Sequence, residues 1–390
     1  TIIDCGRPAA VIFGSHRGFY FHQAEGADSV LSGFTIQGGR VFGSEVPPDP
    51  LRWNPRASHP LGGGIYCEFS SPTISDCIIR DCGAELGGGI GVVGAAPMIV
   101  DCLIEQCTVG ELGAAQSHGR GGAIGMIDAT GATITNCTIR NNSGSYNSHG
   151  AGIYLWQSRS VVAGCTISAN SARGGLQGGG VYCGGTTTDA VLRNCVISQN
   201  EADAGAGIFA EWTFDASLPA AVQSQRALVH VVNCTVAQNT LSSSVTPQPG
   251  GGIHSSGADT FVVNSIVWHN EGTPVVLAGS ASKDPVAYSD IEGDYAGTGN
   301  LSADPLFASL GDPDYHLQSQ HGRYDPQADR WVNDGQHSPC IDAGNPSASV
   351  GDEPAPNGRR INMGAYGGTA EASHGRSEER RVGKECTIQC

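Results

Sequence analysis

The chain has 390 residues, of which 57 are glycine and 15% are charged, and its 21 basic and 37 acidic residues give a net charge of −16. The glycine content argues against a large helical bundle, the lack of a three-residue glycine period excludes collagen, and the patterned apolar runs argue against disorder. The negative charge argues against nucleic acid and anionic membranes as partners, and no stretch approaches the roughly 20 apolar residues of a membrane span.

A two-part phrase recurs along the chain. Its first part is a glycine-rich entry found at 62–65, 87–90, 121–124, 150–153, 178–181, 205–208 and 250–253, with GGGI as the commonest form. Its second part has the form I-x-[DN]-C-x-I-x-x-[NC] and runs from ISDCIIRDC at 74–82 to VVNSIVWHN at 262–270. The steps between its central positions, from Cys77 to Ser265, are 25, 35, 28, 30, 39 and 31 residues. Such self-similarity indicates a repeat architecture.

Each repeat predicts short strands, because β-branched and apolar residues alternate with polar ones and Gly, Asn, Asp or Ser bound each run. Units of this length without a helical period fit one coil of a parallel β-helix, in which each strand pairs with its equivalent in the next coil. A β-propeller blade needs about 40 to 50 residues, so the shorter steps argue against that fold. We therefore expect an all-β, single-stranded right-handed parallel β-helix over residues 1–270.

The repeated phrase predicts two columns of stacked side chains in the β-helix. An apolar column should form the core, and an asparagine column at a coil corner should form a hydrogen-bonded ladder, since Asn also tolerates left-handed backbone. The apolar column comprises Ile79, Ile104, Ile139, Ile167, Ile197, Val236 and Val267. The asparagine column comprises Asn142, Asn170, Asn200, Asn239 and Asn270.

Six cysteines share one repeat position, which predicts an inward column of thiols that act as small buried apolar groups. The rung spacing exceeds the Cβ separation that a disulfide prefers, and the steps match no zinc signature. Cys82 and Cys107 stand where later coils have Asn, so they either fill space at the corner, which we favour, or pair with each other. The column comprises Cys77, Cys102, Cys137, Cys165, Cys195 and Cys234.

Several polar positions were considered as sites of polysaccharide chemistry. Asp76 and Asp101 lie one coil apart, but Asn136, Asn194 and Asn233 share their repeat position, which favours a polar ladder over a carboxylate pair.

Charged and histidine positions also allow two interpretations. Arg80, Glu105 and Arg140 should form an outward column of alternating charge, either a substrate-binding face or, as we favour, exposed pairing between coils. His118 and His149 each stand just before a glycine entry. A catalytic role for them is not favoured, because no carboxylate partner stands at a fixed sequence distance from them.

Aromatic and acidic residues point to two further candidate sites. Glu211 and Trp212, with Trp156 and Trp268, suit an aromatic platform for sugars, although loop tryptophans more often pack on the core. Asp284, Asp290, Glu292 and Asp294 resemble a calcium loop, but their spacing fails the D-x-D-x-D-G pattern. We therefore assign no catalytic residue, and we predict no metal ligand and no cofactor, with Ca²⁺ as a weak candidate.

The repeat fades after Asn270. Residues 271–375 hold short strands among Pro, Gly and Asp turns, and we expect them to form irregular last coils and a cap, with Cys340 and Ile341 closing the end of the solenoid. RSEERRVGKEC at 376–386 resembles the conceptual translation of a sequencing-library adapter. We expect residues 376–390 to be non-native and leave them out of functional reasoning.

These residues resemble a known group. The GGGI and C-x-I-x-x-N phrases are similar to the right-handed parallel β-helix repeat proteins of the pectin-lyase-like superfamily, especially polymorphic outer-membrane-protein repeats. SPCIDAGNP at 338–346 and INMGAYGG at 361–368 look like the region before the sorting signals of the choice-of-anchor Q group, and residues 17–39 look like an early coil. The resemblance covers about residues 1–370 and implies a bacterial protein that is exported or anchored at the cell surface, although this chain shows no signal peptide.

The polygalacturonase and pectate-lyase motifs of that superfamily are missing from the sequence, so a non-catalytic role is expected. The first hypothesis is an extracellular or cell-surface module, a monomer, that is adhesive or binds a polysaccharide or surface glycan. The alternatives are a polysaccharide lyase or glycoside hydrolase acting on a uronate-rich glycan in a groove, and a structural spacer of a larger surface protein.

Overall fold

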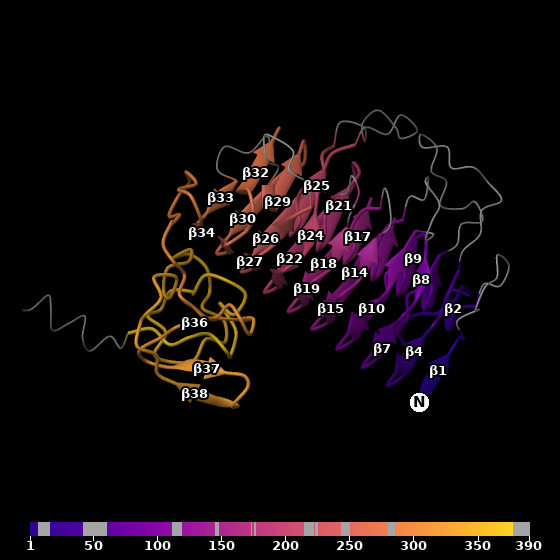
Figure 1. Cartoon of the computed structure of the whole chain (residues 1–390), viewed down its shortest axis with the longest axis horizontal. Helices are drawn as coiled ribbons and strands as arrows, with labels where there is room; N and C mark the ends of the chain where they lie inside the picture. Colours follow the sequence, from indigo (N-terminus) through magenta and orange to yellow (C-terminus); the bar gives the residue numbers. More distant parts are fainter. Residues whose placement is uncertain are drawn as a thin grey trace, which may run out of the picture.

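The structure is a computed structural model that describes residues 1–6, 16–41, 61–110, 119–144, 148–172, 174, 177–213, 222, 225–242, 250–279 and 285–376. The sequence candidates His118 and Asp284, and the tail 377–390, lie outside the described residues. Figure 1 shows the coils stacked in one row from the N-terminus, with the C-terminal segment lying beside the last of them.

The described coils are built from four parallel sheets that the chain visits in a fixed order. In one coil the chain passes through β9 (Ile90–Val93), β10 (Met98–Val100), β11 (Leu103–Glu105) and β12 (Thr108–Val109). Each of these strands pairs in parallel with its counterpart in the next coil. The sheets are called sheets 1 to 4 in this order, and the all-β parallel β-helix prediction is confirmed.

The strands of each sheet recur once a coil. Sheet 1 contains β2 (Phe19–Phe21), β5 (Ile65–Glu68), β9, β13 (Ile124–Ile127), β17 (Ile153–Trp156), β21 (Val181–Gly184), β25 (Ile208–Glu211), β29 (Gly250–Ser256) and β32 (Thr273–Ala278). Sheet 2 contains β3 (Val30–Ser32), β6 (Thr73–Ser75), β10, β14 (Thr130–Thr135), β18 (Arg159–Ala163), β22 (Asp189–Arg193), β26 (Leu228–Val232), β30 (Asp259–Val263) and β33 (Val286–Ala287).

The second pair of sheets completes each coil. Sheet 3 contains β1 (Ile2–Asp4), β4 (Thr35–Gln37), β7 (Ile78–Arg80), β11, β15 (Thr138–Arg140), β19 (Thr166–Ser168), β23 (Val196–Ser198), β27 (Thr235–Ala237), β31 (Ile266–Trp268) and β34 (Asp290–Ile291). Sheet 4 contains β8 (Gly83–Ala84), β12, β16 (Ser143–Gly144), β20 (Ser171–Ala172), β24 (Glu201–Ala202) and β28 (Thr240–Leu241).

The predicted core and cysteine columns are confirmed. All seven residues of the apolar column are fully buried, and so are the six cysteines, which are at most 2% exposed. The twelve described cysteines, Cys82 and Cys107 among them, are free thiols. Each column thiol points at backbone carbonyls, as Cys102 Sγ does at 3.2 Å from the Val100 oxygen and 3.6 Å from the Ile74 oxygen.

The asparagine ladder is also confirmed. From Asn170 onward, the Asn Oδ1 accepts from the backbone N–H and the Nδ2 of the preceding Asn, as Asn200 does from Asn170 at 3.0 Å for both bonds. Asn142, the first of the column, accepts from the Cys107 N–H at 2.9 Å. The left-handed backbone that Asn tolerates is not adopted by the ladder asparagines themselves. The positive φ belongs to the preceding residue, as in Asn141 and Gln199, because one left-handed residue bends the chain so that the next side chain points inward.

The first residue of each entry is glycine in all seven repeats, and in all but Gly250 it has a positive φ. Gly87, for example, has a φ of 63°, and a Cβ on it would lie 2.0 Å from the Ile90 carbonyl oxygen. The second position is less strict, since the buried Ala151 and Ala206 occupy it in two coils. The left-handed backbone therefore explains why glycine recurs at the first position.

The far end of the solenoid is covered by a turn. Tyr295 packs against the main core cluster there, and Asn300 donates to the Val286 oxygen at 3.0 Å and accepts from the Ser289 N–H at 3.1 Å. Asn300 thereby supplies the polar contacts that a further coil would make.

The remaining C-terminal segment, residues 304–376, packs on the side of the helix. It contains the antiparallel pairs β35 (Phe307–Ser309) with β36 (Asp314–Leu317) and β37 (Arg323–Asp325) with β38 (Arg330–Val332). Cys340 and Ile341 cluster with Val196 and Ile266 on the outward face of sheet 3, so the expectation that they close the open end is wrong. The outer face of the last coils is broad and apolar, so Cys340 and Ile341 bury more apolar surface there than at the open end.

The segment is bound to the coils through corner asparagines. Asn194 Nδ2 donates to the oxygens of Ala365 and Gly367 at 3.0 and 2.8 Å. Asn264 accepts from the Asn345 N–H at 2.7 Å, and the Thr235 hydroxyl accepts from the Ala365 N–H at 3.0 Å. The segment thus contacts three consecutive coils.

Candidate functional site

Three residues of the predicted sugar platform meet at the corner where sheet 1 turns into sheet 2. Trp156 ends β17, Glu211 ends β25 and Trp212 follows it. The registers Trp156↔Gly184 and Gly184↔Glu211 place Trp156 and Glu211 two rungs apart with a glycine between them. We call this corner, from β5 to β29, the Trp edge.

The glycine between the coils lets the indole of Trp156 lie on the backbone of the next coil. A Cβ on Gly184 would lie 3.0 Å from Trp156 Cε3 and 2.9 Å from Tyr182 Oη, and one on Gly185 would lie 3.5 Å from Trp156 Cε2. The ring is therefore supported on one side by backbone and is half-buried. An indole held in this way presents an apolar surface at small entropic cost.

Glu211 is held beside this indole by two hydroxyls. Tyr182 donates its hydroxyl to Glu211, and Thr213 Oγ1 donates to Glu211 Oε1 at 2.9 Å. Burial raises the pKa of Tyr182 well above its ordinary range, with further contributions from Tyr154 and Glu211. Tyr182 therefore remains a proton donor and fixes the carboxylate as an acceptor for ligand hydroxyls.

Trp212 adds a second indole on the same edge. Its Nε1 donates to the Gln225 oxygen at 2.8 Å, and its Cβ lies 3.4 Å from the position of a Cβ on Gly257. The side chain is 36% exposed. The edge therefore offers two anchored indoles and one oriented carboxylate.

An aromatic stack on the outward face of sheet 1 supports the edge. Ring centroids are 4.9 Å apart for Tyr154 and Tyr182, 5.8 Å for Tyr182 and Phe209, and 5.1 Å for Phe209 and His254. Arg120 Nε donates to the Tyr154 hydroxyl at 3.1 Å. Sequence reasoning missed this stack, although its signal, an aromatic residue directly after the glycine entry, is present in the repeats.

The other sequence candidates do not converge on this edge. Asp76 and Asp101 are exposed corner residues with positive φ. Asp76 accepts from the Ser32 hydroxyl of the preceding coil at 3.2 Å, and at the same repeat position Asn264 Nδ2 donates to Asn233 Oδ1 at 3.3 Å. The predicted polar ladder therefore occurs in part.

The predicted charge column on sheet 3 occurs in part. Arg140 forms an ion pair with Glu105 at 2.9 Å, while Arg80 donates to Gln37 at 2.8 Å. His149 packs its ring against Tyr182 at 5.1 Å, and Trp268 is 9% exposed beneath the C-terminal segment.

The predicted calcium loop does not form a cluster in the described residues. Asp290 is buried and accepts from the Cys340 thiol at 2.9 Å and from the Ala303 N–H at 3.1 Å. Glu292 accepts from the His269 N–H at 2.8 Å. Among the described residues, no three His, Cys, Asp or Glu side chains gather in a way that could hold a metal ion.

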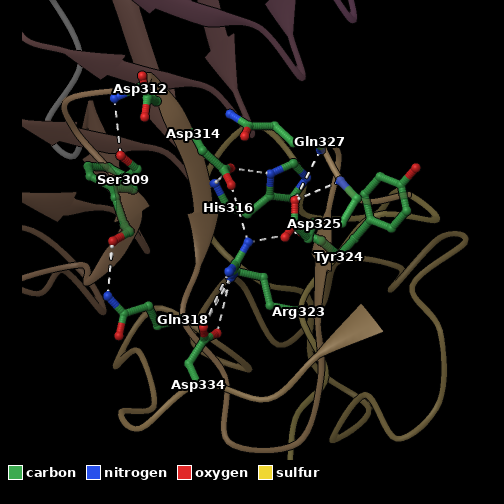
Figure 2. Close-up of polar contacts among 12 residues, drawn as sticks. Ser309, Asp312, Asp314, His316, Gln318, Arg323, Tyr324, Asp325, Gln327 and Asp334 are labelled. Atoms are coloured by element: carbon green, nitrogen blue, oxygen red, sulfur yellow. Dashed lines mark hydrogen bonds and ion pairs between the residues drawn. The ribbon is translucent and has the colours of Figure 1, made fainter. Parts of the chain in front are cut away.

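A second polar cluster lies in the C-terminal segment (Figure 2). His316 Nδ1 is 2.5 Å from Asp314 Oδ1, and Arg323 joins Asp314 Oδ2 at 3.2 Å to Asp334 Oδ2 at 3.1 Å. Burial acts to raise the pKa of Asp314, but the hydrogen bond and charge of His316 leave it below its ordinary value. His316 is 2% exposed, so the cluster links the two antiparallel pairs from within the segment.

A buried carboxyl in the same segment predicts a pH dependence. Glu353 is 6% exposed and accepts from the Asn362 and Gly368 N–H groups at 2.7 and 2.8 Å. Burial raises its pKa to about 7, against the effect of these two bonds. A raised folded-state pKa means that the stability of the segment is highest below about pH 4.5 and falls until the pH passes about 7.

Glu353→Gln should remove this dependence. The variant should match the parent near pH 4 and be more stable near pH 8, by up to about 3 kcal/mol, since one pKa unit corresponds to about 1.4 kcal/mol. Hydrogen exchange of residues 338–376 across this pH range measures the effect. The exposed neighbour Asp352→Asn serves as the control, and an unchanged pH profile of Glu353→Gln would show that the carboxyl is not responsible.

The fold and the edge were compared with known proteins. A family model described as "Right handed beta helix region" matches residues 63–214 and 122–291, which together span more than half of the chain. Searches of the curated proteins and of the solved structures each found no match. The described part of the chain contains no helix that is long and apolar enough to cross a membrane.

Proposed function

The chain belongs to the right-handed β-helix family, and we propose that it is an extracellular or cell-surface module that binds carbohydrate on the Trp edge without cleaving it. The observation that carries the proposal is the pairing of the Trp156 indole, supported on Gly184 and Gly185, with the Glu211 carboxylate fixed by Tyr182 and Thr213. An indole face takes the apolar C–H face of a sugar ring, and the carboxylate accepts from its hydroxyls.

Binding is favoured over hydrolysis by the spacing of the carboxylates. Asp128 lies one rung before Trp156, where its N–H donates to the Trp156 oxygen at 3.1 Å, and Glu211 lies two rungs after it. The two carboxylates are therefore three rungs apart, about 14 Å, whereas paired carboxyl groups that hydrolyse one glycosidic bond lie within about 9.5 Å of each other. The acidic surface, with a net charge of −16 and two lysines in the chain, suits exposure outside the cell.

Calorimetric titration with soluble oligosaccharides tests the proposal. Trp156→Ala and Glu211→Gln should each weaken binding at least tenfold, which corresponds to about 1.4 kcal/mol. Trp331→Ala is the matched control, because Trp331 is 40% exposed but lies in the C-terminal segment. Unchanged binding in both edge variants would refute the site, and shortened products in the parent reaction would favour a lyase or hydrolase.

A further inference from the structure

We propose that the carbohydrate site continues along the Trp edge to Phe69 and takes a linear, uncharged polysaccharide that lies parallel to the helix axis. This inference rests on the proposed function and names the class of ligand. It starts from a residue that sequence reasoning did not single out.

Phe69 occupies the same repeat position as Trp212, one residue beyond the position of Trp156. It follows β5 at the same corner, has a φ of 49° and is 52% exposed. A Cβ on Gly94 would lie 2.4 Å from Phe69 Cε1 and 2.6 Å from Cδ1, so the ring lies directly on the backbone of the next coil. The two tryptophans contact the next coil less closely, since a Cβ on Gly185 would lie 3.5 Å from Trp156 Cε2 and one on Gly257 would lie 3.4 Å from Trp212 Cβ.

The glycines beneath the rings make this arrangement specific. Gly94, Gly185 and Gly257 all have positive φ, between 59° and 95°, and each follows an aromatic-bearing coil. A side chain at Gly94 would displace the Phe69 ring, while at Gly185 and Gly257 the positive φ itself favours glycine. Three aromatic residues therefore lie along one corner against the backbone of the next coil, with Phe69 and Trp212 exposed and Trp156 half-buried. A row of exposed apolar side chains at one edge indicates a surface that a ligand covers.

The spacing of the rings suits an extended polymer. Parallel registers without a shift connect β5 through β9, β13, β17 and β21 to β25. Phe69 and Trp156 are therefore three rungs apart, about 14 Å, and Trp156 and Trp212 two rungs apart, about 10 Å. A straight ligand that contacts all three rings must span about 24 Å along the axis.

The charges along the edge exclude a polyuronate. Glu68 ends β5, Asp128 follows β13 and Glu211 ends β25, so all three lie on it. Of the arginines nearby, Arg226 donates to the Gly257 oxygen at 3.0 Å, and Arg159 has Asp189 as its neighbour in the next coil. Negative side chains repel carboxylated sugars, whereas flat uncharged sugars with equatorial hydroxyls offer C–H faces to the rings and hydroxyls to the carboxylates.

The test is a length series. Soluble β-1,4-linked oligomers of glucose, xylose and mannose, from dimer to hexamer, are titrated against the full chain, with oligogalacturonates as the charged comparison. For at least one uncharged series we expect affinity to rise with length until the oligomer spans about 24 Å, while the oligogalacturonates bind at least tenfold more weakly.

Phe69→Ala separates this inference from the proposed function. It should weaken the longest oligomers about tenfold and leave the dimer unchanged, whereas Trp156→Ala weakens every length. Met98→Ala is the matched control, because Met98 is a 46% exposed apolar residue on sheet 2, and thermal unfolding confirms that each variant is folded.

The possible outcomes distinguish the failure of the extended site from the failure of the proposed function. Loss of binding in Trp156→Ala, with no effect of Phe69→Ala at any length, overturns the extended site and leaves the proposed function intact. Tighter binding of oligogalacturonates overturns the uncharged class. Absence of binding by all three uncharged series overturns the inference and the proposed function together.

Discussion

Replacing Asn200 by leucine is expected to lower the free energy of unfolding of the β-helix by about 4 to 6 kcal/mol. The Asn200 side chain accepts from Asn170 N and Nδ2 and donates to the Ile167 oxygen and Asn239 Oδ1. Leucine would leave these buried groups of the neighbouring coils without partners. Each unsatisfied group costs about 1 to 3 kcal/mol. Urea unfolding followed by circular dichroism measures the change.

The chain itself provides the control for this substitution. Cys82 and Cys107 occupy the same corner position in the early coils, where Cys107 Sγ points at the Glu105 oxygen at 3.4 Å. Asn200→Cys should therefore cost clearly less than Asn200→Leu. Equal stability of the leucine variant and the parent would mean that the ladder does not stabilise the coils.

Replacing Arg323 by methionine is expected to destabilise the C-terminal segment by about 3 to 5 kcal/mol. Arg323 is 12% exposed and bonds to Asp314 and Asp334, each 15% exposed. Methionine keeps most of the apolar stem but leaves the largely buried Asp334 carboxylate without its cation and Asp314 with His316 as its remaining ion-pair partner. Removing one partner of a buried pair is the costly way to break it. Hydrogen exchange of residues 307–332 should report the loss of protection.

Arg330→Met is the matched control, since Arg330 is an exposed arginine of the paired strand β38. It should change exchange little, because exposed charges contribute about 0 to 1 kcal/mol. Similar exchange in both variants would assign the stability of the segment to its apolar contacts alone.

The repeat is the part of this fold that the sequence specifies directly. Residues such as Ile104 and Asn170 recur at fixed offsets, and stacking in register converts that recurrence into columns. The offset of the left-handed residue could not be read from composition, because Asp, Gln, Ala and His occupy it as well as Asn. Backbone geometry selects the position there, and the side chain is free to vary.

The C-terminal segment and the Trp edge were less predictable for a different reason. Cys340 and Ile341 are apolar, which predicts that they are buried. The sequence does not show whether they pack on the open end of the solenoid or on the outer face of sheet 3, where they lie. Trp156 and Trp212 lie on one edge, whereas Trp268 ends the sheet 3 strand β31 and is covered by the C-terminal segment. Phe69 was missed since its partner, Gly94, lies in another coil and has meaning only once the coils are stacked.

The lateral position of the C-terminal segment bears on how the solenoid loses its structure. Repeat arrays fray from their ends, because a terminal coil has a neighbour on one side only. Here residues 345–367 are tied to Asn194, Thr235 and Asn264, one from each of three successive coils. These coils must therefore open together or not at all. The C-terminal end should behave as one cooperative block, and stepwise unravelling should begin at the opposite end of the stack.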